Sequence, residues 1–333
     1  MAGIKDIAKI TGLSVATISR VFNDSPLVSQ KTKTKVLQTA RELDYQPNMM
    51  AAALRSGKSK IIGVIVPEVN NNFFSSIING IEQKVSDLGY NIIISQSHES
   101  EKNESAALQS FAQLNTDGVL MSLSKETTDF SQIRKLIRGK IPIVFFDRAP
   151  EIEQVNSVVL DDYQGAFLAT QHLIDQGCKH IVHIAGDVNV SIFNERRLGF
   201  SGAMKKNGIT CNKKNIIELY WNIQADKTLL KEYLAQNKST DGIFVFGDEG
   251  CLYVMNILKE LGVDIPGQIK LIGFGNADYS AFVNPAISTI DQKCAEMGLW
   301  AAEILLKNLG SDQATFSKRV LSPELIVRDS TRK

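Results

Sequence analysis

The sequence predicts an α/β protein in which a small helical head precedes a larger body of doubly wound parallel sheets. In the first 60 residues, apolar side chains recur at helical spacing and basic residues are in excess. From Ile61 onward, short β-rich runs alternate with helical stretches in two sets of about 100 residues each. The chain of 333 residues is long enough for about two domains.

The charge of the chain is distributed unevenly. Residues 1–60 hold ten Lys and Arg but four Asp and Glu, whereas the whole chain holds 37 basic and 36 acidic residues. A basic head on a mildly acidic body favours a nucleic-acid-binding module joined to another domain. A solvated basic surface without a function is the alternative.

The first two predicted helices are short and are joined by a tight turn. The apolar spacing predicts a helix over residues 4–11, and Gly12 ends it. Ser14 is a good N-cap for a second helix over residues 15–22, because its hydroxyl can accept a bond from an unpaired amide of the next turn. The side chains that this second helix is expected to bury are Ile18, Val21 and Phe22.

A third predicted helix completes the head. Ser29 is its expected cap, and the helix covers residues 30–43. Its expected apolar face consists of Val36, Leu37, Ala40 and Leu43. Three short helices with a four-residue turn around Gly12 form a helix-turn-helix head.

The other face of the second helix has the composition of a DNA-contacting surface. Val15, Ala16 and Ser19 are small, so the helix can enter the major groove deeply. Arg20 can bond bidentately to guanine, and Val15 and Ala16 can contact thymine methyl groups. The residues expected to contact phosphates are Ser14, Thr17, Ser19, Asn23, Thr32, Tyr45 and Asn48. The alternative is a surface arginine on a purely structural helical hairpin.

Several segments of the chain resemble the LacI/GalR family of bacterial transcription regulators. They are IKDIAKITGLSVATISRVFN, VSQKTKTKVLQTARELDYQPN and MMAAALRSGKSKIIGVIVP, in this order and spacing. The resemblance implies that Val15, Ala16 and Arg20 contact base edges of double-stranded operator DNA. It also implies a homodimeric, cytoplasmic repressor of carbohydrate-utilisation genes that binds a near-palindromic operator.

The resemblance also assigns a role to the segment that follows Pro47. It implies a hinge helix that enters the minor groove, with Leu54 as an apolar wedge and Ala51 allowing close backbone approach. An ordinary Ala-rich linker helix is the alternative. The expected domains are a helix-turn-helix domain over 1–46, a hinge and linker over 47–60, and a two-lobed effector-binding and dimerisation domain over 61–333.

The elements of the body follow from the alternation of patterns. The expected strands cover residues 61–66, 91–95, 118–122, 143–146, 180–185, 216–219, 242–246, 270–273 and 287–290. The expected helices cover residues 74–88, 104–114, 130–137, 163–176, 195–207, 225–236, 250–261 and 293–309. The resemblance implies a periplasmic-binding-protein-like body whose chain crosses between the lobes three times, near 160–162, 289–292 and 317–321. One lobe then covers about 61–160 and 292–318, and the other about 161–290 and 320–330.

A cleft between two such lobes is a natural place for a small molecule, because ligands bind outside the carboxyl ends of parallel strands. By resemblance, this ligand is a sugar or sugar derivative that acts allosterically. The residues expected to bind it are Phe73, Phe74, Asp147, Arg196, Trp221, Asp248 and Asn276. The phenylalanines are alternatively core residues, and Asp147 and Asp248 are alternatively helix N-caps.

Two positions depart from the family pattern. Gly275 stands where the family has an aspartate that bonds sugar hydroxyls, and Gly247 stands where it has an asparagine. Because two groups that would bond sugar hydroxyls are missing, these departures favour a larger or different ligand over a simple neutral hexose. The alternative is that Asn276 or Asp278 supplies the missing hydrogen bonds.

Motifs of enzymes are missing from the sequence. It has no GxxxxGK, HExxH or GxSxG segment, and no glycine-rich turn follows the first strand of the body. His180 and His183 are expected to point to opposite faces of a strand, and His98 and His172 to be surface or capping residues. The widely spaced cysteines, Cys178, Cys211, Cys251 and Cys294, indicate reduced cytosolic thiols. The sequence therefore predicts no catalytic residue, no cofactor and no metal.

Two further alternatives concern the class of protein. A periplasmic sugar receptor lacks a helix-turn-helix and carries a signal peptide, whereas this chain begins without the basic-then-apolar pattern of one. An enzyme with an unrecognised site would turn over a candidate ligand. No apolar run approaches the roughly 20 residues that a membrane span needs.

Overall fold

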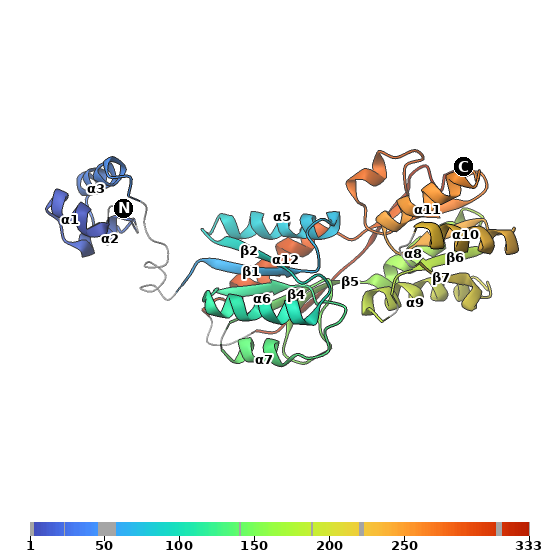
Figure 1. Ribbon diagram of the computed structural model, residues 1–333, viewed down its shortest axis with the longest axis horizontal. Coiled ribbons are helices and arrows are strands. Elements are labelled where there is room, and N and C mark those ends of the chain that lie inside the picture. Colours follow the sequence, from blue (N-terminus) through green and yellow to red (C-terminus); the bar gives the residue numbers. More distant parts are fainter. Residues whose placement is uncertain are drawn as a thin grey trace. The chain divides into compact units, whose positions relative to one another are not determined.

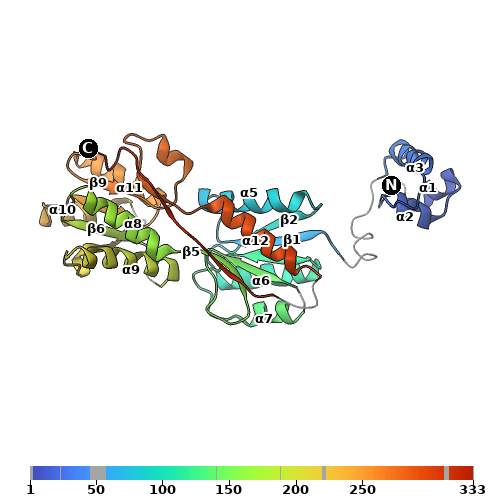
Figure 2. The same cartoon turned by 180° about the vertical axis from the view of Figure 1, so that it is seen from behind.

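The computed structural model describes residues 3–22, 24–45, 58–139, 141–187, 189–219, 223–310 and 315–332. The chain divides into two compact units, Met1–Lys60 and Ile61–Lys333. Figures 1 and 2 show the elements of both units from opposite sides. Each unit is described by itself, beginning with the head.

The head contains three helices within residues 3–45, as expected. They are α1 (Ile4–Thr11), α2 (Val15–Phe22) and α3 (Gln30–Glu42). Gly12 ends α1 with a φ of 69°, in the left-handed region that favours glycine. Ser14 Oγ accepts a bond of 3.1 Å from Thr17 N, and Ser29 Oγ accepts one of 3.3 Å from Thr32 N. Both predicted caps are therefore confirmed.

The core of the head is small and apolar. Its buried members are Ile7, Ile18, Val21, Val36 and Ala40. The prediction for Leu37 is wrong, because this side chain is 40% exposed while Thr39 is buried. On α3 the inward stripe runs through positions 36, 39, 40 and 43, and position 37 lies about 100° away from position 36 around the helix axis.

The first lobe of the body is built on parallel strands. Within the described residues its sheet has six strands in the order β11-β5-β4-β3-β1-β2. Their bounds are β1 Ile61–Val66, β2 Asn91–Gln96, β3 Gly118–Met121, β4 Ile143–Phe146, β5 Asn156–Leu160 and β11 Lys318–Leu321. The flanking helices are α5 Asn72–Ser86, α6 Glu101–Gln113, α7 Ser131–Arg138 and α12 Cys294–Asn308.

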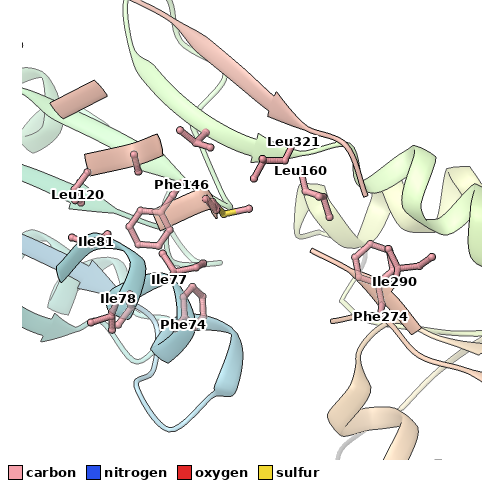
Figure 3. Close-up of a cluster of buried hydrophobic side chains, with 14 of the residues drawn as sticks. Phe74, Ile77, Ile78, Ile81, Leu120, Phe146, Leu160, Phe274, Ile290 and Leu321 are labelled. Carbon is pink, nitrogen blue, oxygen red and sulfur yellow. The ribbon is translucent and has the colours of Figure 1, made fainter. Parts of the chain in front are cut away.

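Alternate side chains of each strand contact opposite layers of helices. Ile62 and Val64 of β1 belong to the core shared with α5 and α12, whereas Ile65 belongs to the core shared with α6 and α7. Figure 3 shows Ile77, Ile78 and Ile81 of α5 on the same side as Leu120 and Phe146 of the sheet. Both faces of this sheet are covered, as expected for parallel strands.

The second lobe repeats this plan. In the described residues its sheet has the order β7-β6-β8-β9, with β6 Ile181–Ala185, β7 Ile216–Glu218, β8 Gly242–Val245 and β9 Lys270–Ile272. Its helices are α8 Asp162–Asp175, α9 Ser191–Lys206, α10 Ile223–Gln236 and α11 Asp248–Glu260, and short 3₁₀ turns cover Lys213–Asn215 and Asp278–Ala281. The α8 and α9 side chains share a core with Ile181 and Phe244, whereas those of α10 and α11 share one with Ile184 and Val245.

The chain crosses between the lobes where three segments run side by side. The first crossing joins β5 to α8 at residues 160–162, and the second joins β10 (Thr289–Asp291) to α12. Strand β12 (Glu324–Ile326) pairs with β10, but β11 pairs along its whole length with β5 of the first sheet. The third crossing therefore follows Leu321 instead of lying within 317–321. The strands β5, β11 and β12 were not predicted as strands.

Two histidines are buried inside the second lobe. The prediction that His172 is a surface or capping residue is wrong, because it is 7% exposed and its Nε2 lies 2.8 Å from Thr331 Oγ1. The C-terminal segment at residues 328–332 covers the last turn of α8. This burial of His172 cannot be predicted from the sequence of α8 alone. His183 stacks on Phe244 at a centroid distance of 4.5 Å, and its Nδ1 lies 3.1 Å from Phe244 O.

We expect His183 to make the protein less stable in mild acid. Burial lowers the pKa of His183 to about 3 from the usual 6.5, so the folded state holds the imidazole neutral while the unfolded chain takes up a proton. Its stabilising contribution is full above pH 6.5 and is lost as pH falls towards 3. Between pH 7.5 and 5.5 the loss amounts to about 1.4 kcal/mol.

Urea titrations at several pH values measure this effect. The variant His183→Phe should lose this part of the pH dependence, whereas His98→Asn, at an exposed position, should retain it. Equal pH dependence of the wild type and His183→Phe would contradict the assignment.

Candidate functional site

The outer face of α2 is open to solvent. Val15 is 40% exposed, Ala16 and Arg20 are exposed, and Ser19 is half-buried. The opposite face carries Ile18 and Val21 into the core of the head. Burial on one side thus leaves a surface of small side chains with one arginine on the other.

The short polar residues of the head are placed at the starts of its helices. Ser14 Oγ lies 2.9 Å from Thr17 Oγ1 at the start of α2, and Ser29 Oγ lies 2.9 Å from Thr32 Oγ1 at the start of α3. Tyr45 is half-buried with its ring 5.4 Å from that of Phe22. The other predicted DNA contacts, Asn23, Asn48, Ala51 and Leu54, lie outside the described residues.

A cavity of about 770 Å³ lies between the two lobes of the body. Its walls come from the segments after the carboxyl ends of β1, β4, β8 and β9 and from the start of α9. Five of the predicted ligand-binding residues line it together: Phe73, Phe74, Asp147, Arg196 and Asp248. Tertiary structure thus brings together residues as far apart in the chain as 73 and 248.

Arg196 connects the cavity wall to two of the crossings. Its side chain is 4% exposed and donates from Nε to Asp162 Oδ1 at 2.8 Å and from Nη2 to Gln292 Oε1 at 3.1 Å. Nη1 donates to Phe246 O at 2.6 Å, and the guanidinium lies 3.8 Å from the ring centroid of Phe274. Burial raises the pKa of Asp162 to about 6, although the neighbouring guanidinium opposes this. All three nitrogens of the Arg196 guanidinium thereby donate to protein acceptors.

Asp147 and Arg148 follow the end of β4 on the opposite wall. Asp147 is buried with a φ of 61°, accepts a bond of 3.1 Å from Ser122 Oγ, and has its pKa raised by burial. Arg148 Nη1 donates to both carboxylate oxygens of Glu99, at 2.9 and 2.8 Å. No described helix begins next to Asp147, because the next element after β4 is the strand β5, so Asp147 is not a helix N-cap.

Asp248 is held by two elements other than its own helix. It is the first residue of α11, but Oδ2 accepts from Ala277 N at 2.8 Å and Oδ1 from Thr289 Oγ1 at 2.6 Å. Burial raises the pKa of this carboxyl. The N-cap of α11 is Gly247, so the alternative role of Asp248 as a cap is wrong.

Other predictions for the cavity had different outcomes. Asn276 is not among its lining residues, and its Oδ1 accepts from Arg328 Nη2 at 2.7 Å. Trp221 lies outside the described residues. Phe74 is both a core residue and part of the wall, and its ring lies 5.0 Å from that of Phe73.

The structure adds residues that sequence reasoning missed. Gln292 lies at the second crossing, and Phe193 and Phe246 form an edge-to-face pair 5.1 Å apart on the second lobe. Tyr279 also lines the cavity, and burial next to Asp248 and Glu249 raises its pKa. The position of Gln292 at the end of a predicted crossing was a usable signal. No sequence pattern predicted the 3₁₀ turn that contains Tyr279.

The described residues contain no group of three or more His, Cys, Asp or Glu side chains that could hold a metal ion. Among the same residues, no helix is both long and apolar enough to span a bilayer.

Family models match two parts of the chain. Residues 3–48 match the model for bacterial regulatory proteins of the lacI family, and residues 170–331 match a periplasmic binding protein-like domain. The chain is 32% identical over 340 residues to the HTH-type transcriptional repressor PurR of Vibrio vulnificus (strain CMCP6), covering 100% of this chain and 99% of that protein.

Two solved structures have the same fold. A lac repressor dimer bound to operator and the anti-inducer ONPF matches with a TM-score of 0.86 and 22% identity, over 99% of each chain. A complex of the transcriptional regulator CelR with cellobiose matches with a TM-score of 0.74 and 23% identity, over 99% of this chain and 100% of that one. The relatives are transcriptional regulators, which agrees with the prediction that this chain is not an enzyme.

Proposed function

Since the chain belongs to the LacI family of bacterial regulatory proteins and is a DNA-binding transcriptional repressor, we propose that a sugar or sugar derivative in the interlobe cavity controls it. It binds a near-palindromic operator in the cytoplasm as a homodimer, each head contacting one half-site. The regulated genes serve carbohydrate utilisation.

The observation that carries the proposal is the composition of the cavity wall. Asp147 comes from the first lobe, whereas Arg196 and Asp248 come from the second. A ligand that contacts both lobes stabilises one arrangement of them over another, and such a difference in affinity is what a population shift requires. Carboxylates and a guanidinium beside aromatic rings suit a polyhydroxylated ligand that donates and accepts hydrogen bonds.

On the DNA side, the exposed face of α2 supports base contacts by Val15, Ala16 and Arg20. The hydroxyl groups of Ser14, Thr17 and Thr32 lie at the N-termini of α2 and α3, where phosphate oxygens are commonly bound. Ser19 lies in the middle of α2 and Tyr45 follows α3, and both complete the proposed phosphate contacts of the described residues. Asn23 and Asn48 complete the proposed phosphate contacts, and Ala51 and Leu54 of the hinge complete the minor-groove contacts.

Selection of binding sites from a random DNA pool, followed by anisotropy titrations with and without sugars, tests the proposal. We expect a near-palindromic consensus, and an effector that changes operator affinity about 5- to 150-fold, which corresponds to about 1–3 kcal/mol of coupling. The logarithm of the affinity should fall linearly with the logarithm of the salt concentration. A protein that binds all sequences equally, or whose operator affinity no sugar or sugar derivative changes, would contradict it.

A further inference from the structure

We propose that the effector is an uncharged glycoside of at least two sugar rings, and that one ring lies against a bare wall of the cavity formed by Gly247 and Gly275. This inference rests on the proposed function and names the ligand class of the same cavity. Three features of the wall carry it: the space at Gly247, the backbone at Gly275 and the pairing of the charges around them.

Gly247 leaves open space beside the cavity. A Cβ atom built on it would meet a single neighbour within 4 Å, the main-chain oxygen of Phe274 at 3.9 Å. The φ of Gly247 is −160°, an extended conformation that any residue adopts. The backbone therefore does not require glycine here, and a missing side chain makes room for a ligand group instead.

At Gly275 the backbone conformation itself explains why the position carries no side chain. Its φ of 146° lies in a region that side chains rarely adopt, so the main chain itself excludes a substituent. A Cβ built there would lie 3.4 Å from Asp248 Oδ2 and 3.6 Å from Gln292 Nε2. A side chain at Gly275 would therefore point towards the polar atoms of Asp248 and Gln292, which line the same cavity.

The charges around the cavity favour an uncharged ligand over an anionic one. Both arginines on its wall are already paired with carboxylates at 2.8 Å, Arg196 with Asp162 and Arg148 with Glu99. Three further acidic side chains line it: Asp147, Asp248 and Glu249. A phosphate or carboxylate would face this excess of acidic groups, whereas sugar hydroxyls can donate to it.

Aromatic rings provide faces for more than one sugar ring. Phe73 lies on the first lobe, whereas Phe193, Phe246 and Tyr279 lie on the second. A first ring can be held between Phe73 and Arg196, and a second ring then extends past Asp248 over Gly247 and Gly275 towards Tyr279. Gly247 and Gly275 then form the floor of the second subsite.

Calorimetric titration of the full chain with matched probes tests this inference. The probes are disaccharides of gluco, galacto, manno and xylo configuration in α and β linkage, their component monosaccharides, and glucose 6-phosphate. We expect at least one disaccharide to bind tenfold or more tightly than either of its monosaccharides, and no binding of the phosphate. Binding of monosaccharides alone, or tighter binding of the phosphate, would overturn the inference but leave a sugar-controlled repressor. If no sugar in the panel binds, both this inference and the proposed control by a sugar would be overturned.

A variant locates the second ring. Gly247→Leu fills the open space, and its ligand-free melting temperature reports whether the fold is retained. The preference for the disaccharide over its component monosaccharide should fall tenfold or more. The matched control is Ser239→Leu, at an exposed position before β8, at the opposite end of the strand from Gly247. An unchanged preference in Gly247→Leu would place the second ring elsewhere and overturn the proposal.

Discussion

Replacing Arg196 with methionine is expected to abolish the response to ligand and to lower the free energy of unfolding by about 3–5 kcal/mol. The substitution leaves the buried Asp162 carboxylate without its 2.8 Å partner, and it removes the donors to Phe246 O and Gln292 Oε1. Removing one member of a buried ion pair costs this much because the remaining charge stays desolvated.

The destabilisation should depend on pH in a defined direction. The pKa of Asp162 is already raised to about 6, and loss of the guanidinium raises it further. The folded variant therefore takes up a proton in mild acid, and the stability lost by Arg196→Met should be smaller at pH 5.5 than at pH 8.

Chemical denaturation at both pH values measures these effects. The double variant Arg196→Met with Asp162→Asn should be more stable than Arg196→Met alone, because no buried charge remains. The control Arg197→Met should cost less than either, since Arg197 is half-buried and donates to Asn194 on its own helix. A double variant no more stable than the single one would show that the ion pair is not the source of the loss.

Replacing Arg20 with alanine is expected to weaken operator binding by about 1–3 kcal/mol per half-site and to relax base preference at one position of each. The side chain is exposed on the face of α2 that carries Val15 and Ala16, so the head should fold without it. In a homodimer the loss occurs at both half-sites of one operator.

A charge-preserving variant separates base contact from general attraction to DNA. Arg20→Lys keeps the positive charge but loses the planar fork that bonds guanine bidentately. It should retain most of the affinity for unrelated DNA while losing specificity, whereas Arg20→Ala should lose part of both. Anisotropy titrations with operator and scrambled DNA measure the ratio. An unchanged ratio in both variants would remove Arg20 from the proposed base contacts.

The fold was largely predictable where local physics decides it. Ser14 and Ser29 cap their helices as expected, because a hydroxyl at an N-cap competes only with water for the nearby amide. The run Ile61–Val66 is a strand with both faces covered, and its aliphatic composition requires that burial. The strands β5, β11 and β12 are short, and they depend on pairing between segments far apart in the chain.

The site was predictable in its members but not in its contacts. Family resemblance named Arg196 and Asp248, and the structure brings both to one cavity. It did not name Asp162 or Gln292 as partners of Arg196, since these residues approach it only when the crossings come together. Asn276 shows the same limit, because its amide bonds to Arg328 instead of facing the cavity.

The sequence alone thus determined the helix-turn-helix head, the alternation of strands and helices, and the family, because these depend on caps, periodicity and motifs within short segments. Tertiary structure alone decided which charges are paired, which histidines are buried and where Gly247 and Gly275 leave a wall bare. Each of these depends on atoms from distant segments, whose desolvation and steric contacts exist only once the lobes are formed.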